Sequence, residues 1–312
     1  MPTDSAPSAT SQRLPQVPEH LIYPLDVFAA DFKSLHDIGE SVWADSDVAF
    51  VGLARNCAAH LEQNLARLEQ LAAGCRSWRL HIETNDNTDD TDQVLLNFCA
   101  AFPQATFTSQ RLDRQQFSTE FAGPRTQALA EYRTACQRWV RDNASQADLV
   151  VVIDWDSWGG WSHAGVMHGV GALQLTPDAA GMASVSLIQH PQMAMGDDQK
   201  PKLMTGWVHY DAWALRLNSA WDDYTAGLGG WKHSWLPPVG SPPVPVVSAF
   251  GGMAIYDTHA YMKGTYSGED CEHVPYHVSM AKRTGQRLYL DPAMRTVMHW
   301  MEPTDGGRNG NH

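Results

Sequence analysis

The sequence predicts an α/β fold, in which a mostly parallel central sheet is flanked by helices and joined by a smaller subregion. Three observations lead to this prediction. Strand-like and helix-like segments alternate between residues 47 and 156, segment 149–153 is a continuous apolar run, and a chain of 312 residues with 43% hydrophobic side chains can bury a large core. Alternation of this kind favours parallel strands with helices on both faces of the sheet.

The first half of the chain contains the regular elements. The predicted strands are the apolar segments 48–54, 78–83, 105–108 and 149–153. Three predicted helices connect them. The first has an apolar stripe at Leu61, Leu65, Leu68 and Leu71, the second covers 91–102, and the third begins at Gly123-Pro124. Ligands on such sheets bind beyond the carboxyl ends of the strands, so we expect the functional residues at that edge.

The second half of the chain is less regular. We predict strands over 182–189, 207–217, 246–256 and 287–290, and a helix over 274–284. Two intervening segments, 190–206 and 221–245, are rich in Gly, Pro and Trp. Long loops in a compact domain are usually functional, so we expect both to form one side of a binding site and to be partly mobile.

Composition and charge exclude several classes of protein. The net charge of −13 disfavours binding to phosphate backbones, so no nucleic-acid partner is expected. No apolar run is long enough to span a bilayer, and residues 1–18 lack the pattern of a signal peptide. Five scattered cysteines, without a CxxC pair, are typical of reduced thiols. We therefore expect a cytoplasmic protein without a transmembrane segment; its oligomeric state is left open.

The strongest motif is Asp154-Trp155-Asp156, directly after the most apolar predicted strand. Two carboxylates at i and i+2 can converge on one hard divalent cation, and Mg²⁺ or Mn²⁺ held in this way keeps positions open for phosphate oxygens. An isolated pair of this kind is common in solvated turns. Because two other polar strand ends share the same sheet edge, we interpret Asp154 and Asp156 as metal ligands, with His299 as a third.

The two other strand ends suggest a nucleotide site. The residues concerned are Arg55 and Asn56 after the first strand, and Glu83, Asn85 and Asp86 after the second. Carboxylates and amides in such a loop can accept hydrogen bonds from a nucleoside base and ribose, although an N-capping turn for the next helix explains the same composition. We predict that a nucleoside lies between Arg55 and the loop that begins at Glu83.

Charged residues elsewhere complete the candidate site. Arg125 lies near the start of a predicted helix and can pair with phosphate, whereas Arg133 fits a structural ion pair equally well. Near the C-terminus, segment 267–274 contains Glu269, Asp270 and Glu272 just before a helix, whose N-terminus should lower carboxylate pKa values. In an extended segment, Asp270 and Glu272 share one face, so we favour them over Glu269 as catalytic groups.

Taken in chain order, these motifs resemble those of glycosyltransferases with the GT-A fold. The resemblance covers about residues 47–300 and is carried by segments 48–56, 83–91, 125–133, 154–156, 210–216, 250–256 and 271–274. The most similar sets are the fungal capsule-associated α-1,3-mannosyltransferases and related bacterial enzymes. The resemblance implies a Rossmann-like sheet, a UDP- or GDP-linked sugar donor, a divalent metal ion, and a glycan or glycoconjugate acceptor, as in polysaccharide biosynthesis.

The same resemblance gives a division of the chain. It implies one catalytic domain over 21–300, with a nucleotide-binding half at 47–156 and an acceptor-side half at 157–300. The polar composition of the two ends predicts a disordered tail at 1–20 and a flexible tail at 301–312. The residues assigned to the acceptor are Trp207, Tyr210, Trp231, Gly251, Gly252 and His273. Asp156 would bind the ion directly, while Asp154 would bind the ion or the ribose.

The reaction class and its stereochemistry have alternatives. An inverting transfer needs a base, for which Asp270 and Glu272 are candidates, whereas in a retaining transfer the leaving phosphate can take the proton. A nucleotidyltransferase uses a similar half-sheet, but normally has a Gly-rich basic loop after its first strand, where this chain has 53–56, Leu-Ala-Arg-Asn. A non-catalytic carbohydrate-binding protein would use the twelve Trp residues and leave the strand-end carboxylates unexplained.

Overall fold

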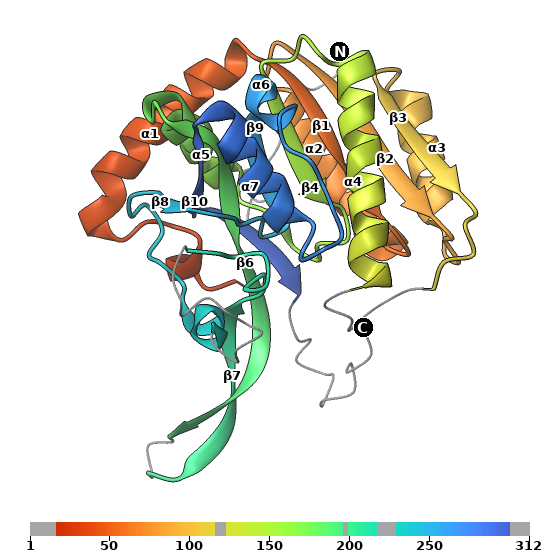
Figure 1. The fold of residues 1–312 in the computed structure, drawn as a ribbon. Helices are drawn as coiled ribbons and strands as arrows, with labels where there is room; N and C mark the ends of the chain where they lie inside the picture. The colour runs from red at the N-terminus through yellow and green to blue at the C-terminus, as the bar shows by residue number, and fades with distance from the viewer. Residues whose placement is uncertain (1–16, 116–122, 196–198, 218–228, 300–312) are drawn as a thin grey trace, which may run out of the picture.

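The computed structural model describes residues 17–115, 123–195, 199–217 and 229–299. Their centre is one ten-stranded sheet with the strand order β3-β2-β1-β4-β9-β6-β10-β5, in which β7 also pairs with β6, and β8 with β10 (Figure 1). Helices flank this sheet, so the predicted α/β class is confirmed.

The first half of the chain forms a parallel block. Its strands are β1 (Asp47–Ala54), β2 (Ser77–Asn85), β3 (Ala105–Gln110) and β4 (Leu149–Asp154). All three pairings among them are parallel, and Leu53 of β1 is in register with Glu83 on one side and Asp154 on the other. The predicted strands of this half are therefore present, and the polar residues that follow β1, β2 and β4 lie at one edge.

The second half is mixed in direction. Its strands are β5 (Gly160–Trp161), β6 (Ala179–Met195), β7 (Pro201–His209), β8 (Val244–Val246), β9 (Met253–Asp257) and β10 (Arg287–His299). β6 and β10 run parallel to each other, whereas β9 is antiparallel to both β4 and β6. β9 thus joins the two halves into one continuous sheet.

Three predictions for this half are wrong in detail. Residues 190–195 and 201–206 are strand rather than loop, because β6 and β7 pair from Leu187–His209 out to Met195–Pro201 and form a hairpin that extends from the body (Figure 1). Residues 210–217 lie outside any strand apart from one bridge at Arg216. The strand expected over 246–256 is split, because Gly251 and Gly252 both have positive φ and turn the chain.

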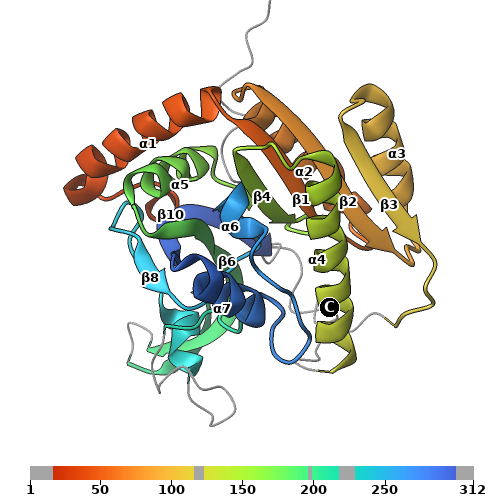
Figure 2. The same cartoon turned by 45° about the horizontal axis from the view of Figure 1, so that its top comes forward.

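Two layers of helices cover the sheet (Figure 2). One face packs against α1 (Ala29–Ala44), α2 (Ala58–Ala72), α3 (Thr91–Ala101) and α5 (His163–Leu175). The other face packs against α4 (Pro124–Asn143), α6 (Thr258–Tyr261) and α7 (His273–Thr284). The stripe expected on α2 is fully confirmed, since its four leucines are all buried.

The chain before α1 is partly packed on the body. Val17, Leu21 and Ile22 are buried against Leu187 and Val297, with short 3₁₀ turns at Glu19–Leu21 and Asp26–Phe28. The expected tail over 1–20 is therefore ordered from residue 17, while 1–16 and the expected tail at 301–312 lie outside the described residues. Among the helices that are described, none combines the length and apolarity needed to cross a bilayer.

Candidate functional site

The turn after β4 presents two carboxylates around a buried indole. Trp155 is fully buried, and Asn64 of α2 donates hydrogen bonds to its carbonyl at 2.9 Å and to that of Ser157 at 2.7 Å. The backbone of Asp154 donates to the carbonyl of Gly252 at 2.9 Å. The Asp-Trp-Asp segment is therefore anchored on both sides, unlike an ordinary solvated turn.

Asp154 and Asp156 differ in their surroundings. Asp154 accepts a hydrogen bond of 2.5 Å on its Oδ1 from Nη2 of Arg133. The side chain of Asp156 is exposed, but the surrounding protein removes part of its hydration; this loss, and then the charge of Asp154, raises its pKa above the usual range. Two carboxylates that repel each other in this way form a site whose charge a divalent cation would neutralise.

The ends of β1 and β2 are joined by their side chains. Nη2 of Arg55 lies 4.0 Å from Oδ2 of Asp86 and donates to the carbonyl of Arg114 at 2.6 Å. Asn56 has a φ of 49°, and its Oδ1 accepts from the backbone of Thr88 at 2.7 Å. The two segments predicted to hold a nucleoside are thus neighbours.

Most polar side chains of the β2 loop already have partners in the protein. Glu83 is buried with its carboxylate 2.9 Å from Nε2 of His81, and Asn85 donates to Asp86 at 2.7 Å. Asp86 also accepts from the backbone of three residues that follow β3: Leu112, Asp113 and Arg114. The hydrogen bond from Asn85, and then those backbone bonds, hold the pKa of Asp86 well below its usual range. These residues shape the loop, and any contact with a ligand would be additional.

Arg133 connects β4 with α7. It is buried on α4, pairs with Asp154, and places its Nε 3.7 Å from Oε1 of Glu272. Its guanidinium also lies over the ring of Phe250, with 4.8 Å between Cζ and the ring centroid. The sequence allowed Arg133 either a phosphate contact or a structural ion pair. The structure shows an ion pair, and its partner is Asp154, a predicted metal ligand.

The Gly251-Gly252 turn lies between Asp154 and a carboxylate that the sequence did not single out, Asp211. Asp211 follows β7 and accepts hydrogen bonds from the backbone of Gly251 at 2.9 Å and of Ala214 at 3.3 Å. Burial raises the pKa of Asp211 to about 7 against these hydrogen bonds, and the charges of Asp154 and Glu272 contribute to the rise. The sequence did not single it out because residue 211 lies inside the strand expected over 207–217, whereas β7 ends at His209.

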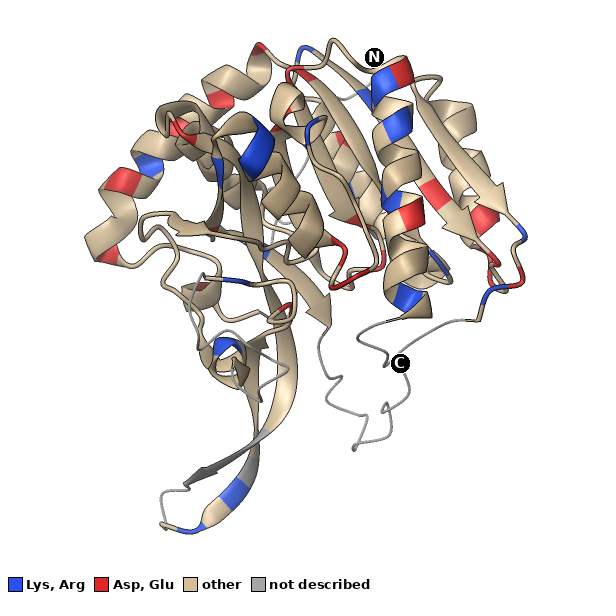
Figure 3. Ribbon diagram, viewed as in Figure 1, with Lys and Arg blue, Asp and Glu red and all other residues tan. Residues whose placement is uncertain are grey.

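The predicted catalytic pair does not share a face. Residues before α7 form a turn rather than an extended segment, and Asp270 points to Arg216, with Oδ1 3.2 Å from Nη2. Glu272 is 4% exposed and faces Arg133. Burial raises its pKa, with the charge of Arg133 opposing the rise, so the expected lowering by the helix N-terminus is wrong for Glu272. Figure 3 shows the acidic loop before α7 and a basic first turn of α4 at the same end of the sheet.

His273 is the clearest correction among the acceptor residues. It is 2% exposed and its ring stacks on Phe250 with 3.9 Å between centroids, so it has no open face for a sugar. Tyr210 and Trp231, by contrast, are 48% and 43% exposed. Loss of hydration, and then the charge of Asp156, raises the pKa of the Tyr210 hydroxyl, so the two side chains lie near each other. Trp207 is half-buried.

His299 lies close to the Asp-Trp-Asp turn without joining its carboxylates. Its ring meets the edge of Trp158 at 4.6 Å, and the backbone of Trp158 donates to the carbonyl of Met298 at 3.2 Å. Within the described ranges, only the half-buried His36 and the exposed Asp37 and Glu40, all of α1, bring three ligand atoms within 4.8 Å of one another. His299 therefore stays a prediction as third ligand.

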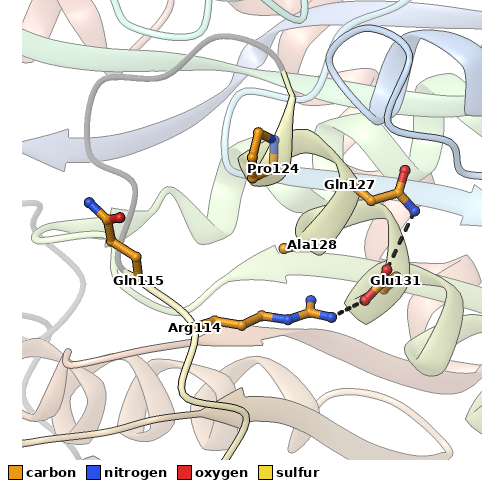
Figure 4. Close-up of a pocket in the computed structure, with 6 residues that line it drawn as sticks. All are labelled: Arg114, Gln115, Pro124, Gln127, Ala128 and Glu131. Carbon is orange, nitrogen blue, oxygen red and sulfur yellow. Dashed lines mark hydrogen bonds and ion pairs between the residues drawn. The ribbon is translucent and has the colours of Figure 1, made fainter.

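A hollow of about 260 Å³ adjoins this edge on the flank of α4 (Figure 4). It is lined by Arg114, Gln115, Pro124, Gln127, Ala128 and Glu131. Arg114 and Glu131 form an ion pair across it, and Gln127 donates to Glu131 at 3.4 Å. The hollow contains neither carboxylate of the Asp-Trp-Asp turn, so it is a neighbour of the candidate site rather than its centre.

Comparison with known proteins gives distant structural matches only. No family model and no curated protein sequence matches the chain. A mannosyltransferase from Pyrobaculum calidifontis, solved with GDP-mannose and Mn²⁺, is 12% identical with a TM-score of 0.46, over 86% of this chain and 67% of that one. Glucosyl-3-phosphoglycerate synthase from M. tuberculosis is 13% identical with a TM-score of 0.48, over 88% and 77%.

A third match is mannosyl-3-phosphoglycerate synthase from Rubrobacter xylanophilus, 12% identical with a TM-score of 0.45, over 86% of this chain and 70% of that one. At these values the likeness assigns neither a family nor an activity to this chain. The resemblance to fungal capsule-associated mannosyltransferases likewise remains an interpretation of short motifs. The geometry of the strand ends is therefore the basis for the function proposed below.

Proposed function

We propose that this protein is a glycosyltransferase that moves a sugar from a UDP- or GDP-linked donor to a hydroxyl acceptor with the help of Mn²⁺ or Mg²⁺. The observation that supports it most is the turn after β4: Trp155 anchors it in the core while Asp154 and Asp156 remain at the surface of the sheet edge. The carboxyl ends of β1 and β2 lie beside this turn, as expected for a nucleotide site on parallel strands.

The residues present fit a divalent cation with two protein carboxylates. Asp156 is exposed, and the charge of Asp154 acts on it, so the pair offers hard oxygen ligands and excess negative charge. Mg²⁺ and Mn²⁺ are commonly held by one or two carboxylates together with substrate phosphates, which leaves room for a diphosphate. When bound, such an ion would act as a Lewis acid on the leaving diphosphate.

The chain's own residues would bind and orient the two substrates. Arg125, in the first turn of α4, acts electrostatically on Asp156 and lies over Trp213, with 5.8 Å between Cζ and the ring centroid; from there it can contact a phosphate. Arg55 and the β2 loop would border the nucleoside. Tyr210 and Trp231 offer exposed aromatic faces on the opposite side, which suit stacking against the rings of a glycan or glycoconjugate acceptor.

Two carboxylates are placed to take a proton from the acceptor if the transfer inverts the anomeric centre. Asp270 is partly exposed beside Arg216, and Asp211 has a pKa raised to about 7, first by burial, which suits a general base near neutral pH. In a retaining transfer neither would be needed as a base. A nucleotidyltransferase and a carbohydrate-binding protein remain the alternatives to the proposal.

The test is calorimetric titration of the full chain with UDP, GDP and the corresponding triphosphates, each with and without Mn²⁺. A glycosyltransferase should bind a nucleoside diphosphate tightly only with metal. Preference for triphosphates would favour a nucleotidyltransferase, and no nucleotide binding would favour a carbohydrate-binding protein. A donor-hydrolysis screen over UDP- and GDP-sugars with Mn²⁺ then identifies the donor.

A further inference from the structure

One buried side chain connects the Asp-Trp-Asp turn to the acceptor-side helix α7. Arg133 is 2% exposed and reaches Asp154 with Nη2 at 2.5 Å. On its other side Nε lies 3.7 Å from Oε1 of Glu272, whose side chain is 5% exposed. The cation is thus placed between one carboxylate at the surface edge and one in the interior.

We propose that Arg133 is a positioning residue for the metal–diphosphate site, and that Glu272 acts on that site only through Arg133. Arg133 holds Oδ1 of Asp154, so that this carboxylate keeps one orientation and can offer only its other oxygen to a cation. Asp156 is exposed and would take the ion more directly. This inference depends on the proposed function, because it concerns the same cation and diphosphate.

The surroundings of Arg133 show why its orientation is fixed. The guanidinium lies over Phe250 at 4.8 Å, and Phe250 is itself held by the ring of His273 at 3.9 Å on parallel planes. A planar guanidinium between an aromatic face and two carboxylates has little rotational freedom, which a lysine in its place would regain. His273, assigned to the acceptor from the sequence, would thus support Phe250 instead.

The burial of Glu272 favours an indirect role over a catalytic one. Its carboxylate is 5% exposed, and the ion-pair contacts that the structure gives it are with Arg133 and with Nε2 of His273 at 3.4 Å. A base that removes a proton from an acceptor hydroxyl must reach that hydroxyl within hydrogen-bond distance. A carboxylate beneath Arg133 is better placed to hold the guanidinium, because a buried cation with one partner removed is strongly destabilised.

The experiment is a double-mutant cycle read by binding and not by turnover alone. Arg133→Lys, Glu272→Gln and the double variant are titrated with UDP and GDP in the presence of Mn²⁺. Contacts that orient a metal ligand typically contribute 10- to 100-fold to metal affinity, so we expect a loss of about that size for Arg133→Lys and a smaller one for Glu272→Gln. Because Glu272 acts through Arg133, the double variant should bind about as tightly as Arg133→Lys.

Arg295→Lys is the matched control. Arg295 is 1% exposed on β10 and its Nη2 donates at 2.5 Å to a carbonyl, that of Pro237, so its replacement also perturbs a buried guanidinium. We expect that variant to lower the melting temperature but to leave the Mn²⁺ dependence of nucleotide binding unchanged. If Arg133→Lys fails to fold, Phe250→Leu takes its place. This variant keeps the charges of the arginine and its two carboxylate partners but removes the ring beneath the guanidinium, so it should weaken Mn²⁺-dependent binding of UDP or GDP.

The outcomes separate the inference from the proposed function. If the parent chain binds no nucleoside diphosphate with Mn²⁺, the proposed function fails and this inference with it. If the parent binds and Arg133→Lys binds equally tightly, the inference alone is overturned. A Glu272→Gln variant with unchanged diphosphate affinity and a large loss of turnover would also overturn it, because that result belongs to a catalytic group on the acceptor side.

Discussion

The two halves of the sheet handle their polar residues in different ways. In the parallel half, the backbone of Thr88 donates a hydrogen bond to Asn56 between the loops after β1 and β2, and Asp86 accepts one from the backbone of Leu112 after β3, all close to the surface. In the mixed half, ionisable groups such as His209, Glu272 and His277 are buried in the interior. The strand-end loops of the parallel half are thus shaped by contacts with one another near the surface, whereas these groups of the mixed half depend on packing in the interior. Changes in the two halves should therefore have different consequences.

The largest expected effect is on binding and belongs to the strand edge of the parallel half. Asp156→Ala should reduce Mn²⁺-dependent affinity for UDP or GDP by at least about 100-fold, because it removes the more exposed of the two carboxylates from the proposed metal site. The melting temperature should change little, since Asp156 is exposed and lies outside the core. Calorimetry and thermal unfolding measure the two effects.

Asp142→Ala is the control for that variant. Asp142 is exposed near the C-terminal end of α4, away from the helix N-terminus where Arg125 lies. Its replacement should leave the Mn²⁺-dependent nucleotide affinity and the melting temperature unchanged. Equal affinity in Asp156→Ala and the parent would show that the turn after β4 does not hold the metal.

A change in the turn that joins the halves should mainly reduce stability. Gly251 has a φ of 67°, and a Cβ there would lie 2.1 Å from the carbonyl oxygen of Ser184. Gly251→Ala should therefore lower the free energy of unfolding by about 2 kcal/mol or more, through strain and a backbone clash. Denaturant unfolding measures this loss. Gly285→Ala is the control, because Gly285 also has a positive φ but a Cβ there would have no atom within 4 Å, so this variant shows the cost of the backbone conformation without the clash.

Acid should destabilise the mixed half. Burial lowers the pKa of His163 to about 4, and those of His209 and His277 to about 3. Below about pH 6.5 these histidines are protonated in the unfolded chain but remain neutral in the folded one. The free energy of unfolding therefore falls as the pH drops from about 6.5 towards 3 to 4. Each histidine contributes a slope of roughly 1.4 kcal/mol per pH unit within that window.

Variants at two histidines test this pH dependence. His277 accepts or donates hydrogen bonds with Ser248 at 2.9 Å and Tyr256 at 2.8 Å, so His277→Gln should lower stability at pH 7 but flatten its decline towards pH 5. His259→Gln, at an exposed position, should keep the parent slope. If the free energy of unfolding depends on pH equally in both variants and the parent, His277 does not contribute to the acid sensitivity.

The smallest expected effect concerns the β2 loop. Asp86→Asn keeps the shape of the side chain but replaces the carboxylate that accepts three backbone hydrogen bonds with a neutral amide. The amides of Leu112, Asp113 and Arg114 should therefore lose protection from hydrogen exchange. Asp90→Asn, exposed at the start of α3, should not change protection there. A loss confined to the amides of residues 112–114 would confirm that Asp86 organises this loop locally.

Much of the parallel half was predictable because its information is local. The leucine stripe of α2, the apolar run of β4 and the helix start at Gly123-Pro124 each appear within one window of sequence, and the structure has all three. The adjacency of Arg55 to Asp86 follows from the rule that parallel strands end at one edge. The sequence by itself thus determined the sheet edge where the candidate site lies.

Only the tertiary structure decided the rest. The glycines of α5 read as poor helix formers, yet a Cβ at Gly171 would lie 1.9 Å from the carbonyl oxygen of Leu35, so their absence of a side chain permits α1 and α5 to pack closely. Asp270 and Glu272 are two residues apart, but their partners, Arg216 and Arg133, come from distant segments. Side-chain partners separated by dozens of residues leave no local pattern, which is why the sequence indicated the ionisable residues before α7 but not what each of them contacts.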